Sequence, residues 1–284
     1  MLHQGATDIG QGSNTVIAQI VADALGFDVH KLILLGPDTD VTPDAGKTSA
    51  SRQTYVTGMA ARRAGESLRR EILRRVNLSE TAEVSFSPRK ITVSDPDSRA
   101  VIKLEGLEEN EFGYVLMAEE TYDPPTEPLD EKGQGKPYAV YGYGAQLAEL
   151  SVDTVLGTVK LTRITAAHDV GRAINPLLVE GQIEGGIAQG IGMALMEDYV
   201  PGQTENLHDY LIPTIGDIPP VQSLIIEVPD AHGPYGAKGL GEHVLIPTAP
   251  AILNAIAHAT GVRMRSVPVT PSKLAAALKG DKNG

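Results

Sequence analysis

The sequence predicts an α+β fold, in which mixed sheets pack against helices. Segments with helical apolar spacing and segments of alternating polarity both occur, but they do not alternate regularly as in a βαβ fold. The chain has 284 residues, of which 42% are hydrophobic, and this is enough for a sizeable core. Because aromatic residues make up only 4% and Trp is absent, we expect a core of Val, Ile, Leu and Ala.

The first half of the chain is predicted to hold two helices and several strands. Apolar positions from Val16 to Leu25 recur at helical spacing, with Ser13 or Asn14 capping the start and Gly26 the end. The other elements are expected as a strand at 29–36, a long polar loop at 37–53, a helix at 54–76, and strands within 82–118, where YVLMAEETY (114–122) alternates.

The segment 123–137 is rich in Pro, Gly and charge and is predicted to link two subdomains, 1–122 and 138–284. In the second subdomain, two strands are expected around the turn TVLG. The predicted elements there are strands at 140–153, 158–170 and 221–229, and helices at 181–199, 248–261 and 270–279.

Composition and charge exclude several classes of function. The net charge of −12, without a basic stripe, argues against a nucleic-acid partner. The absence of cysteine excludes disulfides, thiolate zinc sites and an iron–sulfur cluster held by this chain. No apolar run reaches ~18 residues, and the N-terminus has no signal-peptide pattern. We therefore expect a cytoplasmic chain without a membrane span.

Two glycine- and hydroxyl-rich loops lead into helices, GQGSNT (10–15) and TSASRQ (48–53). A helix N-terminus attracts phosphate, but ordinary capping explains the same residues, so both interpretations stay open. DAGKTS (44–49) resembles half of a nucleotide-binding P-loop, but Val41 stands where that pattern requires glycine. DTDVTPD (38–44) lacks the ligand spacing of a calcium loop and is interpreted as a solvated acidic turn.

The predicted helix 181–199 is unusually rich in glycine near Gln182 and Gln189. Each helical glycine costs about 1 kcal/mol relative to alanine, so something must approach this backbone closely. Another helix and a flat ligand are equally good explanations. The glycines are Gly181, Gly185, Gly186, Gly190 and Gly192.

Histidines and arginines carry weaker signals. The seven histidines form no metal-binding motif, so each is expected to have a surface or core role. The segment 61–75 holds arginines at 62, 63, 69, 70, 74 and 75. It is either a solvated face paired with Glu66 and Glu71 or a surface for a partner.

Glu242 is an isolated acid in the glycine-rich apolar stretch GPYGAKGLGEHVLIP (233–247). A carboxylate that loses its hydration there becomes a stronger base, which suits a general base. A solvent-facing loop acid, or an acid serving the start of the next helix, is the alternative.

Taken together, these segments resemble the xanthine oxidase/aldehyde oxidoreductase family of molybdenum hydroxylases. The match is to the C-terminal half of the molybdenum-binding subunit and covers nearly the whole chain. The resembling segments follow the family's order: GATDIGQGSNT, DTDVTPDAGKTSASRQ, HDVGRAINPLLVEGQIEGGIAQGIG, YLIPTIGDIPP and GAKGLGE.

The resemblance implies that Glu242 is the catalytic base beside the molybdenum. It also implies a molybdopterin cofactor, in the cytosine dinucleotide form, whose dithiolene holds the metal, so no protein metal ligand is expected. The cofactor-binding residues implied in this way are Gly10, Gln11, Gly12, Thr48, Ser49, Ala50, Ser51, Arg52, Gln53, Gln182 and Gly241.

The family resemblance also implies partners. The N-terminal half of the molybdenum subunit is expected on a further chain or segment, and iron–sulfur clusters and FAD on partner subunits. The expected reaction oxidises a small aldehyde or N-heterocycle with oxygen derived from water. The alternative is a half-domain without cofactor that serves as a scaffold or assembly partner.

Overall fold

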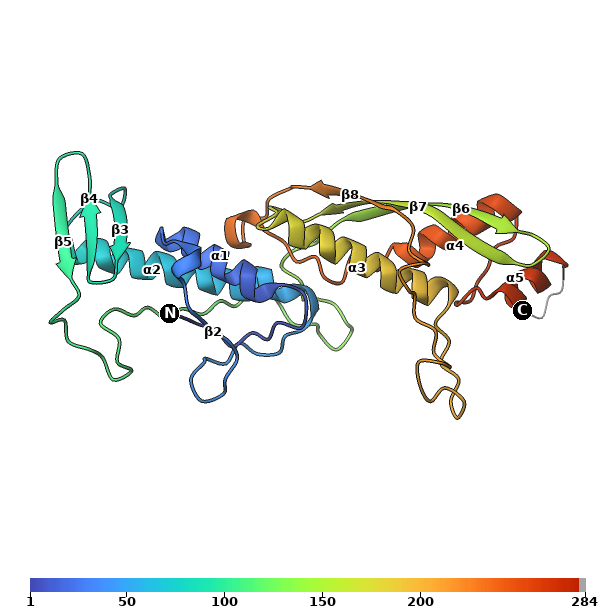
Figure 1. Ribbon diagram of the computed structural model, residues 1–284, viewed down its shortest axis with the longest axis horizontal. Coiled ribbons are helices and arrows are strands. Elements are labelled where there is room, and N and C mark those ends of the chain that lie inside the picture. The colour runs from blue at the N-terminus through green and yellow to red at the C-terminus, as the bar shows by residue number, and fades with distance from the viewer. Residues whose placement is uncertain (281–284) are drawn as a thin grey trace. The chain divides into compact units, whose positions relative to one another are not determined.

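The computed structural model describes residues 1–280 and divides the chain into two compact units. Unit 1 comprises residues 1–140 and 229–237, and unit 2 comprises 141–228 and the residues from Lys238 onward. Each unit combines helices with small sheets, so the predicted α+β class is confirmed (Figure 1). The segment 123–137, interpreted as a linker, lies within unit 1 in this division. In the described part of the chain, no helix has both the length and the hydropathy to cross a bilayer.

Unit 1 contains two helices, a three-stranded antiparallel sheet and a short parallel strand pair. The helices are α1 (Ser13–Leu25) and α2 (Gly58–Val76), the sheet is β3 (Glu83–Ser87), β4 (Lys90–Ser94) and β5 (Arg99–Lys103), and the parallel pair is β1 (Leu2–His3) and β2 (Leu34–Leu35). Short helical turns are η1 (Val29–Lys31), η2 (Ala50–Arg52), η3 (Gln53–Thr57) and η4 (Pro234–Gly236).

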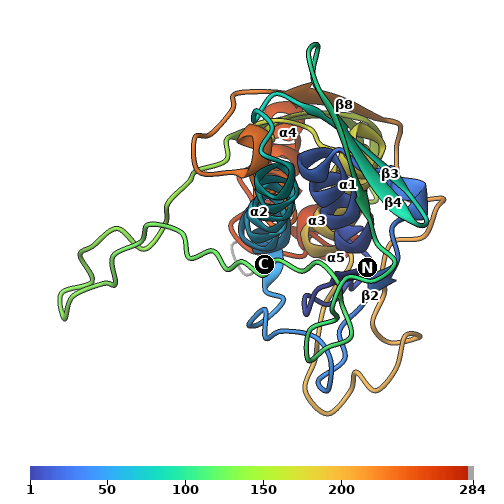
Figure 2. The same cartoon turned by 90° about the vertical axis from the view of Figure 1, so that its left-hand side faces the viewer.

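Helices α1 and α2 lie side by side (Figure 2) and approach closely at Gly65. A Cβ atom added there would lie 2.8 Å from the Cβ of Ala24 and 3.0 Å from the carbonyl oxygen of Val21. Only glycine therefore allows this crossing. The ends of the helices bury Leu25, Ile72 and Leu73 against residues of the antiparallel sheet, and these form one core.

Unit 2 is a three-stranded sheet with helices on one face (Figures 1 and 2). The strands are β6 (Gly144–Asp153), β7 (Thr158–Asp169) and β8 (Val221–Ile226), with β7 antiparallel to β6 and parallel to β8. The helices are α3 (Pro176–Leu195), α4 (Thr248–Thr260) and α5 (Pro271–Leu278). The core between sheet and helices is aliphatic, as predicted: Ile164, Ile183, Ile187, Ile191, Ile252, Ile256 and Leu274 are fully buried.

Three local predictions differ from the structure. Residues 114–122 do not form a strand, and the third strand of the sheet is β5. A turn joins β4 to β5, and in this turn Asp95 accepts hydrogen bonds from the backbone N–H groups of Asp97 (3.1 Å) and Ser98 (2.7 Å). The segment 29–36 is a helical turn followed by a two-residue strand. The glycine-rich helix begins at Pro176 rather than 181, because Asn175 caps it by accepting from the N–H of Leu178.

Candidate functional site

The glycine loop before α1 is organised by Asp8, which sequence reasoning did not single out. Its carboxylate accepts hydrogen bonds from the backbone N–H groups of Gly10 (2.9 Å), Gly12 (3.3 Å) and Asn14 (3.1 Å). Burial alone would raise the pKa of Asp8, but these donors hold the pKa below its usual value. An internal carboxylate thus satisfies backbone N–H groups at the start of α1, and the N-cap position is Gly12 rather than the predicted Ser13 or Asn14.

Gln11 is engaged within the same loop. Its amide nitrogen donates to the carbonyl oxygen of Thr7 (3.2 Å) and to the hydroxyl of Ser13 (3.1 Å), and its Oε1 accepts from the N–H of Ile9 (2.7 Å). The flanking Gly10 and Gly12 have positive φ angles of 105° and 79°. The loop is therefore a preformed structure that glycine and Gln11 maintain together.

The second predicted loop lies against the first within unit 1. The backbone N–H of Thr7 donates to the hydroxyl of Thr48 at 2.9 Å. A Cβ atom at Gly5 would lie 2.1 Å from the carbonyl oxygen of Pro43, so the two segments touch through their backbones. The fold thus brings together two loops that sequence analysis could only treat separately.

Residues 50–57 connect this loop to α2 through the turns η2 and η3. Gln53 is buried, and its Oε1 accepts from the hydroxyl of Thr57 at 2.6 Å, but its Nε2 has no partner among the described residues. The Arg52 side chain donates to the carbonyl oxygen of Lys47 (2.9 Å). Ser49 is exposed and Ser51 half-buried, whereas the side chain of Ala50 lies outside the described part of the chain. The π-helical turn η3 is of a kind found frequently at functional sites.

In unit 2, the loop that carries Glu242 is anchored before that residue by a buried ion pair. The Nζ of Lys238 lies 2.6 Å from Oδ2 of Asp169, and both side chains are more than nine-tenths buried. Burial alone would raise the pKa of Asp169, but the ion pair with Lys238 and the N–H of Gly171 hold the pKa below its usual value. The backbone N–H of Lys238 also donates to the carbonyl oxygen of Val170 at 2.9 Å.

The loop is anchored again just after Glu242, at Val244. The Val244 side chain is fully buried and seated on α3, where a Cβ atom at Gly186 would lie 2.3 Å from its Cγ2. Its carbonyl oxygen accepts from Nε2 of Gln146 (2.8 Å) and from the hydroxyl of Thr248 (3.3 Å). The backbone on both sides of Glu242 is therefore fixed to the core of unit 2.

Glu242 itself and its neighbour Gly241 are exposed in this chain. The expectation that Glu242 has lost its hydration is thus wrong for the chain alone. The reason lies in the loop geometry: Lys238, Leu240 and Val244 turn inward and take the buried positions, which leaves Gly241 and Glu242 outward. Glu242 thus stands on a fixed backbone with an exposed side chain.

Two histidines that sequence analysis left unconnected meet beside this loop. The rings of His168, at the end of β7, and His243 have centroids 5.1 Å apart at an angle of 69°. Burial, together with the nearby His243, lowers the pKa of His168 to about 4. Burial likewise lowers the pKa of His243. Both rings are therefore neutral near pH 7.

The glycines of α3 divide into two groups, which resolves part of the open question about them. A Cβ atom at Gly190 would lie 2.3 Å from the Cβ of Thr248, and Gly186 faces Val244. These two glycines therefore allow the start of α4 and the residues before it to pack closely against α3. Gly192 allows the side chains of Glu197 and Pro213 to pack closely against the helix. Gly181 and Gly185 are exposed, with open space where a Cβ would stand. Close packing therefore explains Gly186, Gly190 and Gly192, but it does not explain Gly181 and Gly185.

Gln182 lies between these two open glycines, half-buried in the second turn of α3. It was expected at the very start of the helix, but Asn175 and Pro176 start the helix earlier. Its backbone N–H is consequently used within the helix, and only its side chain remains available to a ligand.

Comparison with known proteins places this chain in a family. Residues 1–219 match the model of the molybdopterin cofactor-binding domain. The chain belongs to this family. It is 35% identical to the xanthine dehydrogenase molybdenum-binding subunit of Escherichia coli O157:H7, over 96% of this chain and 37% of that protein. It is 32% identical to the 6-hydroxypseudooxynicotine dehydrogenase complex subunit gamma of Paenarthrobacter nicotinovorans, over 97% of this chain and 36% of that protein.

The structure of the aldehyde oxidoreductase from Desulfovibrio desulfuricans is similar as well. It superposes with a TM-score of 0.82 at 30% identity, covering 97% of this chain and 28% of that one. The resemblance to molybdenum hydroxylases that the motifs indicated is thereby confirmed, and the P-loop interpretation is set aside. This molybdopterin-binding chain spans about a third of the length of the relatives that it matches.

The residues present fit a large, polar cofactor. The buried Nε2 of Gln53, without a partner among the described residues, is a donor that awaits an acceptor. The open backbone at Gly181 and Gly185 allows close approach of a flat group next to Gln182. Among the described residues, no cluster of three or more His, Cys, Asp or Glu side chains is arranged to hold a metal ion.

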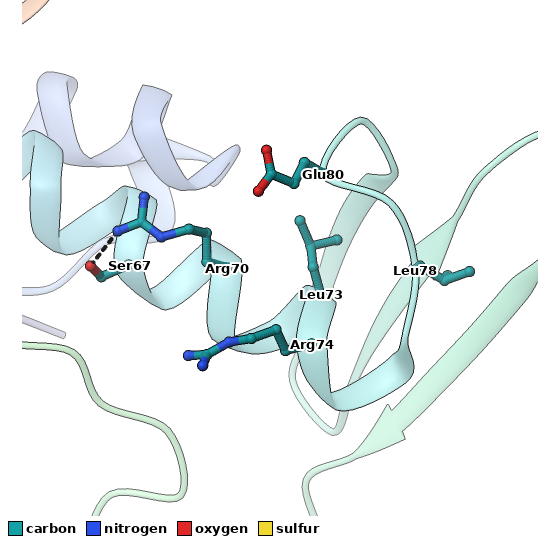
Figure 3. A pocket seen from close by; sticks show the side chains of 6 residues that line it. All are labelled: Ser67, Arg70, Leu73, Arg74, Leu78 and Glu80. Atoms are coloured by element: carbon teal, nitrogen blue, oxygen red, sulfur yellow. Dashed lines mark hydrogen bonds between the residues drawn. The ribbon is translucent and has the colours of Figure 1, made fainter.

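A hollow of about 390 Å³ lies toward the C-terminal end of α2, away from the end that loop 48–53 enters. Figure 3 shows Arg70, which donates to Ser67, and Arg74 on the helix, with Glu80 on the segment that follows it. Its lining residues are Ser67, Arg70, Leu73, Arg74, Leu78 and Glu80. None of these belongs to the predicted cofactor-binding set.

Proposed function

We propose that this chain supplies the catalytic base and part of the cofactor cradle of a multi-subunit molybdenum hydroxylase. The enzyme oxidises an aldehyde or an N-heterocycle with oxygen derived from water. Family membership supports the reaction class, and the relatives include both an aldehyde oxidoreductase and a subunit of a 6-hydroxypseudooxynicotine dehydrogenase complex. The observation that carries the proposal is the anchored loop that presents Glu242.

The cofactor of this proposal is molybdopterin in its cytosine dinucleotide form. When bound, its molybdenum supplies the two-electron oxidation, and its dithiolene holds the metal, so the chain provides no metal ligand. We infer that the predicted subdomains, 1–122 and 138–284, are each molybdopterin-binding. The assigned residues are Gly10, Gln11, Gly12, Thr48, Ser49, Ala50, Ser51, Arg52 and Gln53 of unit 1, and Gln182 and Gly241 of unit 2.

Glu242 acts in this proposal as the general base that takes a proton from the attacking oxygen. Its carboxylate is exposed in this chain, so it becomes desolvated only when cofactor, substrate and the rest of the enzyme enclose it. A carboxylate that loses water becomes a stronger base. The anchors at Lys238 and Val244 matter because a displaced base loses much of its effect.

Partner chains complete the enzyme in this proposal. The rest of the molybdenum subunit, on a separate chain or segment, closes the substrate pocket, and iron–sulfur and flavin subunits carry the electrons away. The absence of cysteine supports placing the iron–sulfur clusters on other chains. The cytoplasmic location stays a prediction from the sequence.

The decisive experiment is Glu242→Gln in the complete complex purified from its host. We expect molybdenum content by mass spectrometry to be unchanged and kcat to fall by about 10²–10⁴-fold, because the amide cannot accept the proton. The matched control is Glu149→Gln, an exposed acid on β6 that is expected to leave kcat unchanged. Retained turnover in Glu242→Gln would reject the base assignment.

The cofactor-free scaffold predicts a complex in which this chain never acquires molybdenum. Membership of the molybdopterin cofactor-binding family does not favour that alternative. The metal analysis of the unmodified complex tests it directly: molybdenum in stoichiometric amount contradicts the scaffold, and its absence contradicts our proposal.

A further inference from the structure

Three polar side chains surround the backbone just after Glu242: the buried His168 on β7, and the half-buried Gln146 on β6 and His243 itself. Nε2 of Gln146 lies 2.8 Å from the carbonyl oxygen of Val244 and 3.1 Å from Nε2 of His168. The rings of the two histidines contact each other edge to face. One glutamine thus joins the loop of Glu242 to the histidine pair.

The hydrogen bonds of Gln146 determine the state of His168. A carbonyl oxygen only accepts hydrogen bonds, so the atom facing Val244 must be the amide nitrogen of Gln146. That same nitrogen faces Nε2 of His168, which must therefore accept. An imidazole that accepts at Nε2 carries its proton on Nδ1 and is neutral. The geometry assigns one tautomer and one charge to His168.

Two glycines at the start of β6 make room for the two rings. A Cβ atom at Gly144 would lie 2.5 Å from Nδ1 of His168, and one at Gly142 would lie 2.6 Å from Nδ1 of His243. Between them, the carbonyl oxygen of Tyr143 accepts from the N–H of Asp169 at 2.8 Å. Each ring therefore stands edge-on against a glycine backbone, and neither can shift without moving β6 or its partner ring.

This cluster costs stability, so simple core packing does not account for it. Nδ1 of His168 and Oε1 of Gln146 are buried without a hydrogen-bond partner among the described residues, whereas a backbone hydrogen bond with Gly142 partly offsets the lowering of the pKa of His243 by burial. Each buried unsatisfied polar atom costs on the order of 1–3 kcal/mol, and aliphatic side chains of similar size would avoid that cost. Polar groups that are retained at such a cost concentrate at functional positions.

We propose that Gln146, His168 and His243 are positioning residues that hold the Glu242 carboxylate at the reaction site. They act through the backbone: Gln146 fixes the carbonyl of Val244, and the ring of His243 is wedged between His168 and Gly142. Glu242 lies between this cluster and the Lys238–Asp169 ion pair, so its Cα is held from both sides. The catalytic consequence rests on the proposed role of Glu242.

The test compares Gln146→Leu with Gln222→Leu in the complete, cofactor-loaded complex. Leu at 146 removes both hydrogen bonds at similar volume, whereas Gln222 is an exposed glutamine on β8 of the same sheet and serves as the matched control. For Gln146→Leu we expect unchanged molybdenum content and KM, and a fall in kcat of about 10²-fold, the effect of a base misplaced by about 1 Å. Hydrogen–deuterium exchange should rise in the peptide covering residues 239–247 and stay unchanged in α5.

A second pair of variants keeps the test valid if Gln146→Leu does not fold. His168→Gln can place an acceptor oxygen near the position of Nε2, whereas His168→Leu provides none. We expect His168→Gln to restore kcat and loop protection toward the wild-type values and His168→Leu to lose both.

Two outcomes would overturn the positioning role: full kcat in Gln146→Leu, whether or not the loop exchanges faster, or loss of the cofactor itself. Failure of the proposed function is distinguishable from these outcomes, because it appears as turnover retained in Glu242→Gln. Exchange of the loop is measured independently of turnover.

Discussion

At the scale of single residues, the site depends on side chains that are charged or neutral because of where the fold puts them. Asp8 is held ionised by the backbone donors of the glycine loop, and Asp169 by Lys238. His168 is held neutral by burial and by the donor Nε2 of Gln146. Sequence analysis found Glu242 from its unusual neighbours but gave His168 no particular role, because nothing local marks a histidine that meets its partner across the sheet.

The buried histidines predict acid sensitivity. The pKa of His168 is lowered from 6.5 to about 4 in the folded chain, so between these values the unfolded chain binds more protons. The unfolding free energy should therefore be highest above pH ~6.5 and should fall by roughly 2–3 kcal/mol as the pH drops to about 4. The groups around His168 are His243, Gln146 and the Asp169–Lys238 pair, and the lowered pKa values of His243 and Asp169 act in the same direction.

Urea denaturation at a series of pH values measures this effect. The control is His168→Gln, which removes one titrating group and should flatten the loss of stability between these pH limits. Identical pH slopes for the wild type and the variant would show that His168 does not titrate as the structure indicates.

At the scale of elements, α3 combines two uses of glycine that look alike in the sequence. Gly186 and Gly190 lie where Val244 and Thr248 press against the helix, whereas Gly181 and Gly185 face open space. The sequence left a packed helix and a ligand as equal explanations. In the structure, close packing explains Gly186 and Gly190, and Gly181 and Gly185 remain for the proposed cofactor.

Alanine substitutions separate the two groups of glycines. Gly185→Ala should raise the unfolding free energy of the chain by about 0.5–1 kcal/mol, because alanine is the better helix former and meets no neighbour. Gly190→Ala should lower it by about 1–3 kcal/mol, because its Cβ would lie 2.3 Å from the Cβ of buried Thr248. Chemical denaturation checks both, and equal effects at the two positions would contradict the packing described.

At the scale of the whole molecule, the chain leaves unit 1 at Val140, returns to it for residues 229–237 and re-enters unit 2 at Lys238. The return segment packs within unit 1, where the guanidinium of Arg62 lies 4.6 Å from the ring centroid of Tyr235. The loop of Glu242 thus follows directly on a crossing between the units. The ion pair of Lys238 with Asp169 fixes the point of re-entry.

The proposed assembly predicts a docking role for the arginine-rich helix. Arg62 and Arg75 are paired with Glu66 and Glu71, as expected for a solvated face. Arg70 and Arg74 are exposed and have no ion-pair partner among the described residues, on a chain of net charge −12.

Reversing both charges, Arg70→Glu with Arg74→Glu, should weaken association with a partner subunit by at least about tenfold in Kd. Binding of the purified partner subunits, measured by interferometry, provides the test. Arg89→Glu, at an exposed position that pairs with Glu105 (3.5 Å), is the control. Assembly unaffected by the double reversal would assign this face to solvent.

The sequence by itself determined the α+β class, most of the helices and strands, and the family, because apolar periodicity, capping residues and glycine motifs are properties of short segments. It predicted a strand at 114–122 that the structure does not have, and it misplaced the start of α3, which the Asn175 cap determines. Only the tertiary structure showed the filling of the α1 terminus by Asp8, the exposure of Glu242, and the meeting of Gln146, His168 and His243. These depend on contacts between segments far apart in the chain, and local spacing carries no information about which distant side chain will face a given loop.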